Sequence, residues 1–306
     1  MIFTNLDFLT NLPLTEYAKY FGKHKKPKHT SKRFRSNIML NPLKLKHLNR
    51  IDESSADMIT LNLEDAIAPS RKKEALLNIA LFLSHLENSS SFIIVRTNPL
   101  ADGGEEEIAF LNDFGFDAVR VAKVKTETEI AQILTLLSAD KELHISLETK
   151  EAFSNLKRLR IDERLTVANL GILDLLTSLG LAQSIVTLNN PTIDYILSKF
   201  LVDAKIAGIH PISFMFQEYN DTDTFKAWCQ HEKLMGFESK ACMGPKQVEI
   251  ANKVFSLDSD AIKRAKSIKH LFEAQSMKNN HGFMHEKYGF IDEPIYRDSL
   301  LVLNKI

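Results

Sequence analysis

Cysteine is scarce in this chain of 306 residues, which contains only Cys229 and Cys242. Two cysteines give neither the spacing of a metal site nor the density of a disulfide framework, and they suit a reducing compartment. No apolar run approaches the roughly 20 residues that span a bilayer. No basic segment precedes an apolar stretch at the start, as it does in a signal peptide. We therefore expect a cytoplasmic protein with no membrane contact.

The chain also has no net charge, because Lys plus Arg and Asp plus Glu number 39 each. No overall field attracts nucleic acid or an anionic membrane, so we expect no partner of either kind. The basic run KHKKPKHTSKR at residues 23–33 has no aromatic residue among its lysines. We interpret it as a solvated arm or linker rather than as a nucleic-acid patch. Substrate recognition is therefore expected to be local.

From residue 35 onward, strand-like and helix-like segments alternate, and their number predicts a (β/α)8 TIM barrel. The competing fold is a doubly wound sheet, but no Gly-x-Gly-x-x-Gly follows the first strand. We expect strands at residues 37–40, 58–64, 92–97, 118–123, 144–148, 165–170, 209–214 and 237–241. We expect helices at residues 71–83, 127–137, 150–158, 175–182, 192–205 and 224–234.

The chain exceeds what a barrel needs at both ends. We expect an N-terminal leader at residues 1–33, the barrel at 34–256 and a C-terminal helical extension at 257–306. The extension contains expected helices at 259–277 and 294–303, separated by a loop with Gly282 and Gly289. We interpret the extension as a cover for the barrel mouth or as a subunit contact.

The segment MITLNLED at residues 58–65 places two carboxylates at the end of a strand. Ile59, Leu61 and Leu63 share one face of this strand, and Glu64 and Asp65 end it. In an α/β barrel the active site gathers at the carboxyl ends of the strands. The pair is therefore a candidate for the catalytic centre.

Two further carboxylates end successive expected strands. Glu148 follows the fifth strand, and Asp174 follows the sixth in the segment GILD. Neighbouring strand ends place both groups where they can share one Mg²⁺, which protein carboxylates, waters and substrate oxygens usually hold together. Each carboxylate alone suits a loop or a helix N-cap, and Asp174 in particular has the position of a cap.

Three cations belong to the same candidate site. Arg96 ends an apolar strand, and its planar fork suits a carboxylate or a developing enolate oxygen. A structural ion pair between Arg96 and Glu64 or Asp65 is the equal alternative. Arg35, before the first strand, and Lys123, at the end of the fourth, add two cations near the expected mouth.

Taken together, these segments resemble the citrate lyase β-subunit and malyl-CoA lyase group of the HpcH/HpaI aldolase family. The matching segments keep the family's order, and they are RSNIMLNP (35–42), LNLEDA (61–66), VRTNP (95–99), LET (147–149), GILDL (171–175), GFESK (236–240), PKQ (245–247) and YGFIDEP (288–294).

The resemblance implies a TIM barrel with a C-terminal helical extension, assembled as a homo-oligomer, usually a trimer or hexamer. It implies cleavage or formation of a carbon–carbon bond in a 3-hydroxyacyl thioester of malyl-CoA, citramalyl-CoA or citryl type, carried by CoA or an acyl-carrier protein. It also implies an enolate held by Mg²⁺, with Glu148 and Asp174 as the metal ligands. A 2-keto acid aldolase of the same family remains open, as does a degenerate barrel that binds a ligand without turnover.

The resemblance also implies roles for the remaining candidates. Arg96 would bind the substrate carboxylate and steady the enolate, and Glu64 and Asp65 would assist proton transfer. Arg35 would lie near the thioester arm, and Lys123 would bind substrate. The chain departs from the family pattern at Asn62, usually Asp, in MGP (243–245), usually Ile-His-Pro, and in Ala122-Lys123, usually Pro-Lys.

Overall fold

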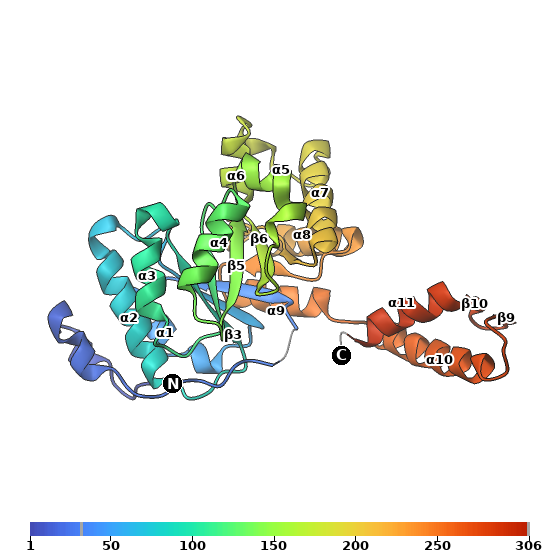
Figure 1. The fold of residues 1–306 in the computed structure, drawn as a ribbon, viewed down its shortest axis with the longest axis horizontal. Coiled ribbons are helices and arrows are strands. Elements are labelled where there is room, and N and C mark those ends of the chain that lie inside the picture. Colours follow the sequence, from blue (N-terminus) through green and yellow to red (C-terminus); the bar gives the residue numbers. More distant parts are fainter. Residues whose placement is uncertain (31–32, 305–306) are drawn as a thin grey trace. The chain divides into compact units, whose positions relative to one another are not determined.

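The computed structural model describes residues 1–30 and 33–304 of the chain. Its centre is a sheet of eight strands in the order β7-β6-β5-β4-β3-β2-β1-β8 (Figure 1). Every neighbouring pair in this sheet is parallel. The strands are β1 (Ser36–Leu40), β2 (Met58–Asn62), β3 (Phe92–Thr97), β4 (Ala118–Val121), β5 (Glu142–Leu147), β6 (Leu165–Leu170), β7 (His210–Ile212) and β8 (Lys240–Cys242).

The two edge strands of this sheet meet and close it into a barrel. Ser213, just after β7, pairs in the parallel sense with Lys240 of β8. The Ala241 N–H donates to the Ser213 carbonyl oxygen at 3.1 Å. An open doubly wound sheet has two free edges, so that alternative is excluded. The expected (β/α)8 barrel is confirmed.

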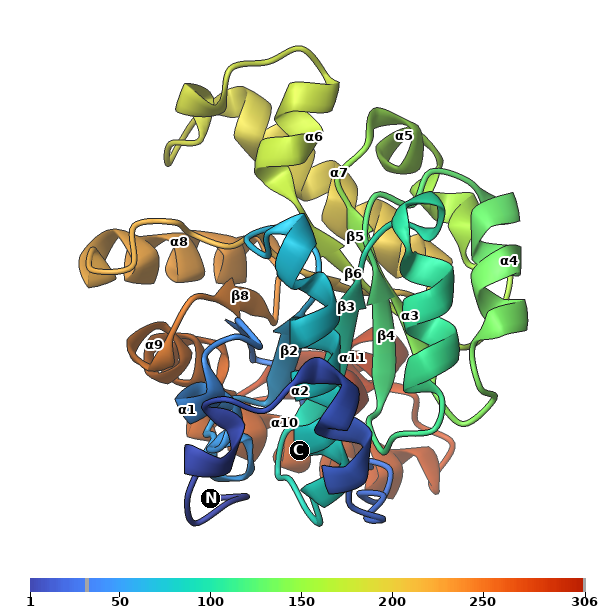
Figure 2. The same cartoon turned by 90° about the vertical axis from the view of Figure 1, so that its left-hand side faces the viewer.

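Helices surround the barrel, and α3, α4 and α5 follow one another along one side of it (Figure 2). Helix α5 illustrates the cause, since Ala152, Phe153, Leu156 and Leu159 recur at helical spacing and are buried. The helices are α1 (Leu45–Leu48), α2 (Lys72–His85), α3 (Gly104–Leu111), α4 (Glu127–Leu136), α5 (Lys150–Leu159), α6 (Ile172–Ser178), α7 (Pro191–Ala207), α8 (Thr222–Met235) and α9 (Pro245–Phe255).

The first 30 residues belong to the barrel unit, and most described side chains of the basic run at 23–33 are exposed, as expected of a solvated segment. Leu9 and Tyr17 are buried, and the Phe3 ring contacts Phe82 of α2 edge-on at 5.1 Å. Within the basic run, Lys26 is buried and its Nζ lies 2.8 Å from Asp117. Residues 31–32 of that run lie outside the described residues.

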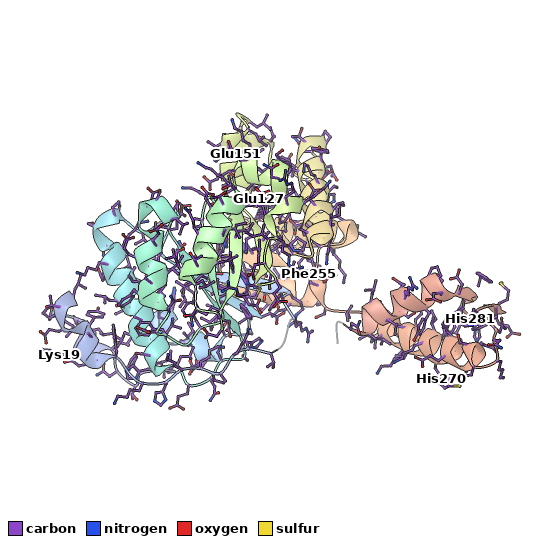
Figure 3. The ribbon with its side chains drawn as sticks, viewed as in Figure 1. Lys19, Glu127, Glu151, Phe255, His270 and His281 are labelled. Atoms are coloured by element: carbon purple, nitrogen blue, oxygen red, sulfur yellow. The ribbon has the colours of Figure 1, made fainter. Side chains whose placement is uncertain are left out.

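A second compact unit, Ser256–Ile306, follows Phe255, the last residue of α9 and of the barrel unit (Figure 3). It contains α10 (Ser259–Ser276) and α11 (Glu293–Leu303), which pack together. The expected loop with Gly282 and Gly289 is in fact an antiparallel hairpin of β9 (Gly282–His285) and β10 (Gly289–Asp292). A small core holds the unit together, formed by Ile268, Phe272 and Ile291.

Candidate active site

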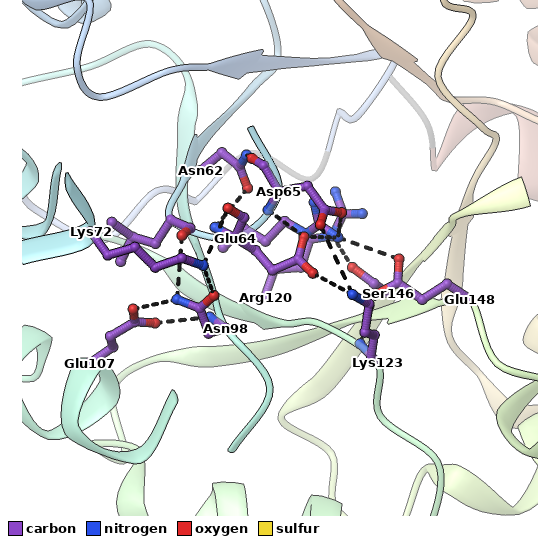
Figure 4. Close-up of polar contacts among 12 residues, drawn as sticks. Asn62, Glu64, Asp65, Lys72, Asn98, Glu107, Arg120, Lys123, Ser146 and Glu148 are labelled. Carbon is purple, nitrogen blue, oxygen red and sulfur yellow. Dashed lines mark hydrogen bonds and ion pairs between the residues drawn. The ribbon is translucent and has the colours of Figure 1, made fainter. Parts of the chain in front are cut away.

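Charged side chains follow one another along the carboxyl ends of adjacent strands (Figure 4). Glu64 and Asp65 come after β2, Arg96 lies near the end of β3, Lys123 follows β4 and Glu148 follows β5. Because β2, β3, β4 and β5 are neighbours in the sheet, these five residues lie together at one end of the barrel.

Two cavities open at this end of the barrel. The first has a volume of about 370 Å³, and its lining includes Asp65, Arg96, Arg120, Glu148, Asn169 and Asp174. The second has a volume of about 530 Å³, and its lining includes Lys123, Lys125, Glu148 and Asp174. Glu148 and Asp174 therefore border both cavities.

Glu64 lies at the centre of the charged cluster and is only 3% exposed. Arg96 Nη2 is 2.9 Å from Glu64 Oε2, and Lys123 Nζ is 3.0 Å from Glu64 Oε1. The Asp65 N–H donates to Glu64 Oε2 at 2.6 Å. The ion pair between Arg96 and Glu64 that the sequence left open is therefore present.

The neighbouring carboxyls of Glu64 and Asp65 have unlike proton affinities. Burial acts to raise the pKa of Glu64, but the hydrogen bond with Asp65 and the charge of Arg96 lower it to about 2. The hydrogen bond with Glu64, burial and the Glu64 charge together raise the pKa of Asp65 to about 6. Glu64 is thus a permanent anion, whereas Asp65 exchanges a proton near neutral pH.

Asn62, the departure from the family pattern in this segment, stabilises the turn after β2. Its side-chain oxygen accepts a hydrogen bond from the Glu64 N–H at 3.3 Å, and its Nδ2 donates to the Asp65 carbonyl oxygen. An aspartate has no N–H for the second bond. The next residue, Ala66, has a φ of 68°, in the left-handed region. The amide therefore holds a strained turn that presents both carboxyls.

Glu148 is held from two sides. The Lys123 N–H donates to Glu148 Oε1 at 2.8 Å, and Arg96 Nη2 lies 3.4 Å from Glu148 Oε2. Lys123 has a φ of 54°, an uncommon conformation for a residue with a side chain. In this conformation its main chain binds Glu148 while its Nζ binds Glu64. The hydrogen bond with Glu64 also raises the pKa of Lys123.

A divalent cation is the cofactor that this donor set fits. Glu148 and Asp174, the carboxylates that border both cavities, are hard oxygen donors, and Mg²⁺ is held by one or two such groups with waters and substrate oxygens. Gly171 leaves room for Glu148, because a Cβ at position 171 would lie 2.7 Å from Glu148 Oε2. The described residues contain no group of three or more His, Cys, Asp or Glu side chains that could hold a metal ion, so a closed zinc-type site is absent there.

Asp174 lies in the first turn of α6, and Gly171 occupies the N-cap position instead. The side chain of Asp174 is exposed to the cavities and not folded back as a helix cap. This location leaves its carboxylate open to a ligand.

Arg35 lies at the opposite end of the barrel from the cavities, which corrects the expectation that it is near the mouth. It precedes β1, and its guanidinium makes two 2.8 Å hydrogen bonds with Asp57, which precedes β2. In a parallel barrel, residues that precede strands lie at the amino end. Arg35 therefore stabilises that end and is not close to Glu64, Arg96 or Glu148.

Sequence reasoning missed a second layer of polar residues. Asn98 binds Glu107 through its Nδ2 at 2.5 Å and accepts a hydrogen bond from Lys72 (Figure 4). Burial raises the pKa of Glu107. Asn98 lies in the segment VRTNP, so its position in that motif was the available signal. Lys72 and Glu107 belong to helices α2 and α3, and their positions in the sequence gave no such signal.

Arg120 was also missed, although it interrupts the apolar segment AVRV of β4. It is buried and its Nε donates to Ser146 Oγ at 2.8 Å. Burial and the nearby Arg96 charge lower the pKa of Arg120 to about 9. A charged residue inside an apolar strand was the signal that could have identified it.

A closed parallel barrel with paired carboxylates and cations at the carboxyl ends of its strands has the architecture in which α/β-barrel enzymes place their active sites. Residues 40–245 match the model of the HpcH/HpaI aldolase/citrate lyase family. The chain belongs to this family, as the segments in its sequence indicated.

Individual relatives differ in activity. The chain is 28% identical to a (3S)-malyl-CoA thioesterase of Cereibacter sphaeroides over 78% of this chain and 82% of that protein. It is 25% identical to the citrate lyase subunit beta of Leuconostoc mesenteroides over 78% of this chain and 82% of that protein. Its fold resembles that of CitE from Mycobacterium tuberculosis in complex with magnesium, acetoacetate and coenzyme A, with a TM-score of 0.70, 16% identity and coverage of 90% and 98% of the two chains.

None of the helices in the described residues is both long and apolar enough to cross a membrane.

Proposed function

We propose that this protein is a Mg²⁺-dependent carbon–carbon lyase that cleaves or forms a 3-hydroxyacyl thioester. The observation that carries the proposal is the position of Glu148 and Asp174, which border both cavities, beside the Arg96 and Glu64 pair. One cavity suits the acyl group that reacts, and the adjoining one, lined by Lys123 and Lys125, suits the thioester arm. Family membership and the citrate lyase relative support this chemistry.

Glu148 and Asp174 would hold the cation. A bound Mg²⁺ would supply a Lewis acid that stabilises negative charge on a substrate oxygen. The protein's own cation at this place is Arg96, which lines the first cavity and has an Nε–H without a partner in the described part of the chain. That guanidinium can bind a substrate carboxylate while Glu64 keeps it in position.

Asp65 is the candidate for proton transfer. In the cleavage direction, a base removes the proton of the 3-hydroxyl oxygen, the bond between C2 and C3 breaks, and the electron pair passes to the thioester fragment, which is then protonated. Asp65 lines the cavity and has a pKa of about 6, so it can accept and return a proton near neutral pH. The hydrogen bond with Glu64 maintains this raised pKa, whereas the charges of Arg96 and Lys123 act to lower it.

Thioester hydrolysis is the second candidate function, because the (3S)-malyl-CoA thioesterase of Cereibacter sphaeroides is 28% identical. A 2-keto acid aldolase and a barrel without turnover are the remaining alternatives. The reaction products distinguish the lyase from these three alternatives. A lyase gives an acyl-CoA and a 2-oxo acid, whereas a thioesterase gives free CoA and the hydroxy acid.

The test is to incubate the protein and Mg²⁺ with malyl-CoA, citramalyl-CoA and citryl-CoA and to identify the products by mass spectrometry. We expect acyl-CoA and 2-oxo acid from at least one thioester, at a rate that falls by about 100-fold or more in Glu148→Ala and with chelator. Glu163→Ala, which changes an exposed glutamate before β6 at the opposite end of the barrel, is the control. Cleavage of free 2-keto acid substrates alone would indicate an aldolase, and no product from either panel would contradict catalysis.

A further inference from the structure

The first cavity is also lined by two polar side chains whose donors make few or no hydrogen bonds within the described residues. Arg120 of β4 and Asn169 of β6 both line this cavity, and both are almost completely buried. They differ from Glu64, Arg96 and Glu148, whose charges are paired with one another. The reaction described above uses neither Arg120 nor Asn169.

No carboxylate of the described residues lies within ion-pair distance of Arg120, although the charges of Glu148, Glu64 and Asp65 act on it from farther away. Its single side-chain hydrogen bond within residues 1–30 and 33–304 goes to the neutral hydroxyl of Ser146 at 2.8 Å. Its pairing partner in β3 is Arg96, so two arginines lie side by side on adjacent strands. Burying a guanidinium beside a like charge is costly unless an anion compensates it.

Asn169 supplies a second free donor. Thr60 Oγ1 donates to Asn37 Oδ1 at 2.8 Å, and Asn37 Nδ2 donates to Asn169 Oδ1 at 3.1 Å. These two hydrogen bonds use the Oδ1 acceptor of Asn169 and leave its Nδ2 donor without a partner in the described residues. Asn169 of β6 is the pairing partner of Ser146 of β5. Ser146 in turn accepts the hydrogen bond from Arg120, so the free amide of Asn169 lies one strand away from that bond.

We propose that Arg120 and Asn169 form an anion subsite for a second carboxylate of the substrate. This inference rests on the proposed function and refines it, because it selects a thioester whose released 2-oxo acid carries two carboxylates. One carboxylate lies with Arg96 and the cation ligands, and the other lies with the Arg120 guanidinium and the Asn169 amide. A cavity of about 370 Å³ has room for a four-carbon acid as well as the reacting groups.

The test compares malate with lactate, which share a 2-hydroxycarboxylate and differ in the second carboxylate. Their dissociation constants are measured by calorimetry with Mg²⁺ present. Wild-type protein is expected to bind malate about tenfold or more tightly than lactate, as a charge-assisted pair of hydrogen bonds requires. In Arg120→Met the ratio falls to about one while lactate binding is unchanged, and Arg158→Met, a surface arginine, keeps the wild-type ratio.

A role for Arg120 in folding alone would leave the malate to lactate ratio of the variant unchanged, and that result overturns the subsite. Equal binding of the two acids by wild-type protein overturns it as well, without need of any variant. If the protein binds malate more tightly than lactate and this preference requires Arg120, but no thioester is cleaved, the subsite is supported and the lyase reaction is contradicted. If thioesters are cleaved but malate is not bound more tightly than lactate, the lyase reaction is supported and the subsite is contradicted.

Discussion

Gly171 determines how closely Glu148 can approach the chain that follows β6. A Cβ at position 171 would lie 2.7 Å from Glu148 Oε2 and 2.8 Å from Glu148 Cβ, both shorter than normal contacts. The φ of Gly171 is −91°, which alanine adopts without strain, so a substitution here acts through the contact alone. The absence of a side chain at position 171 therefore leaves room for Glu148, which we propose as a metal ligand.

We expect Gly171→Ala to weaken Mg²⁺ binding by about 10- to 100-fold, the usual effect of disturbing groups that orient metal ligands. Titration calorimetry with Mg²⁺ measures the change. Gly282→Ala, in the Ser256–Ile306 unit, has only the Phe290 ring nearby and serves as the matched control. Unchanged Mg²⁺ affinity in Gly171→Ala would show that Glu148 is not a ligand.

We expect Asp65 to make catalysis dependent on pH. Its pKa is raised to about 6, so the carboxyl is ionised above that pH and protonated below it. If the ionised form is the base, kcat/KM for cleavage rises with pH through about 6 and is level above about pH 7. Asp65→Asn is expected to lose activity by about 100-fold or more and to lose this rise as well. A rate that is constant from about pH 5 to pH 8 would assign the proton transfer to another group.

At the scale of elements, the strand ends were the part of the site that the sequence could reveal. Glu64 and Glu148 stand where an apolar strand stops, and parallel strands bring such positions together. Arg35 was misplaced because it precedes its strand and so belongs to the opposite end of the barrel. The free donors of Arg120 and Asn169 depend on contacts between β3, β4, β5 and β6 that no single segment encodes.

The packing of the N-terminal leader is a second feature that the sequence could not predict. Helix α2 buries the consecutive residues 79–83 completely, which one helix face against a sheet cannot do. Something must cover its outer face, and the segment around Leu9 and Tyr17 does so. The apolar run IALFL at residues 79–83 indicated that another segment covers this helix, but nothing in the run indicated that the N-terminal leader does so. Most described side chains of the KHKKPKHTSKR segment are exposed, as expected, but the burial of Lys26 could not be predicted because its partner, Asp117, is distant in the sequence.

We expect Lys26→Met to lower the free energy of unfolding by about 3–5 kcal/mol, because it leaves a buried charge on Asp117 without its cation. The side chains of Lys26 and Asp117 are 2% and 1% exposed. Urea denaturation followed by circular dichroism measures the loss. Lys25→Met, at the exposed neighbouring position, is the control and is expected to change stability by less than about 0.5 kcal/mol. Equal stability of the two variants would mean that the pair contributes nothing.

At the scale of the whole molecule, the chain consists of a barrel unit and the Ser256–Ile306 unit. We propose that it functions as a homo-oligomer, a trimer or hexamer. Large apolar side chains are exposed on the second unit, including Met277 at 89% and Met284 at 75%. Light scattering would then give a mass that is three or six times 34.8 kDa. A mass of one chain would contradict this assembly.

Thermal unfolding with Mg²⁺ and a thioester tests the central proposal most directly, because a ligand that binds only the folded state raises its apparent stability. We predict that Mg²⁺ raises the Tm of the wild-type protein, that one acyl-CoA of the panel raises it further, and that the second increase requires Mg²⁺. In Glu148→Gln both increases are lost while the fold remains. A wild-type protein that is folded and shows no shift with Mg²⁺ or any thioester would contradict the assignment of a metal-dependent lyase.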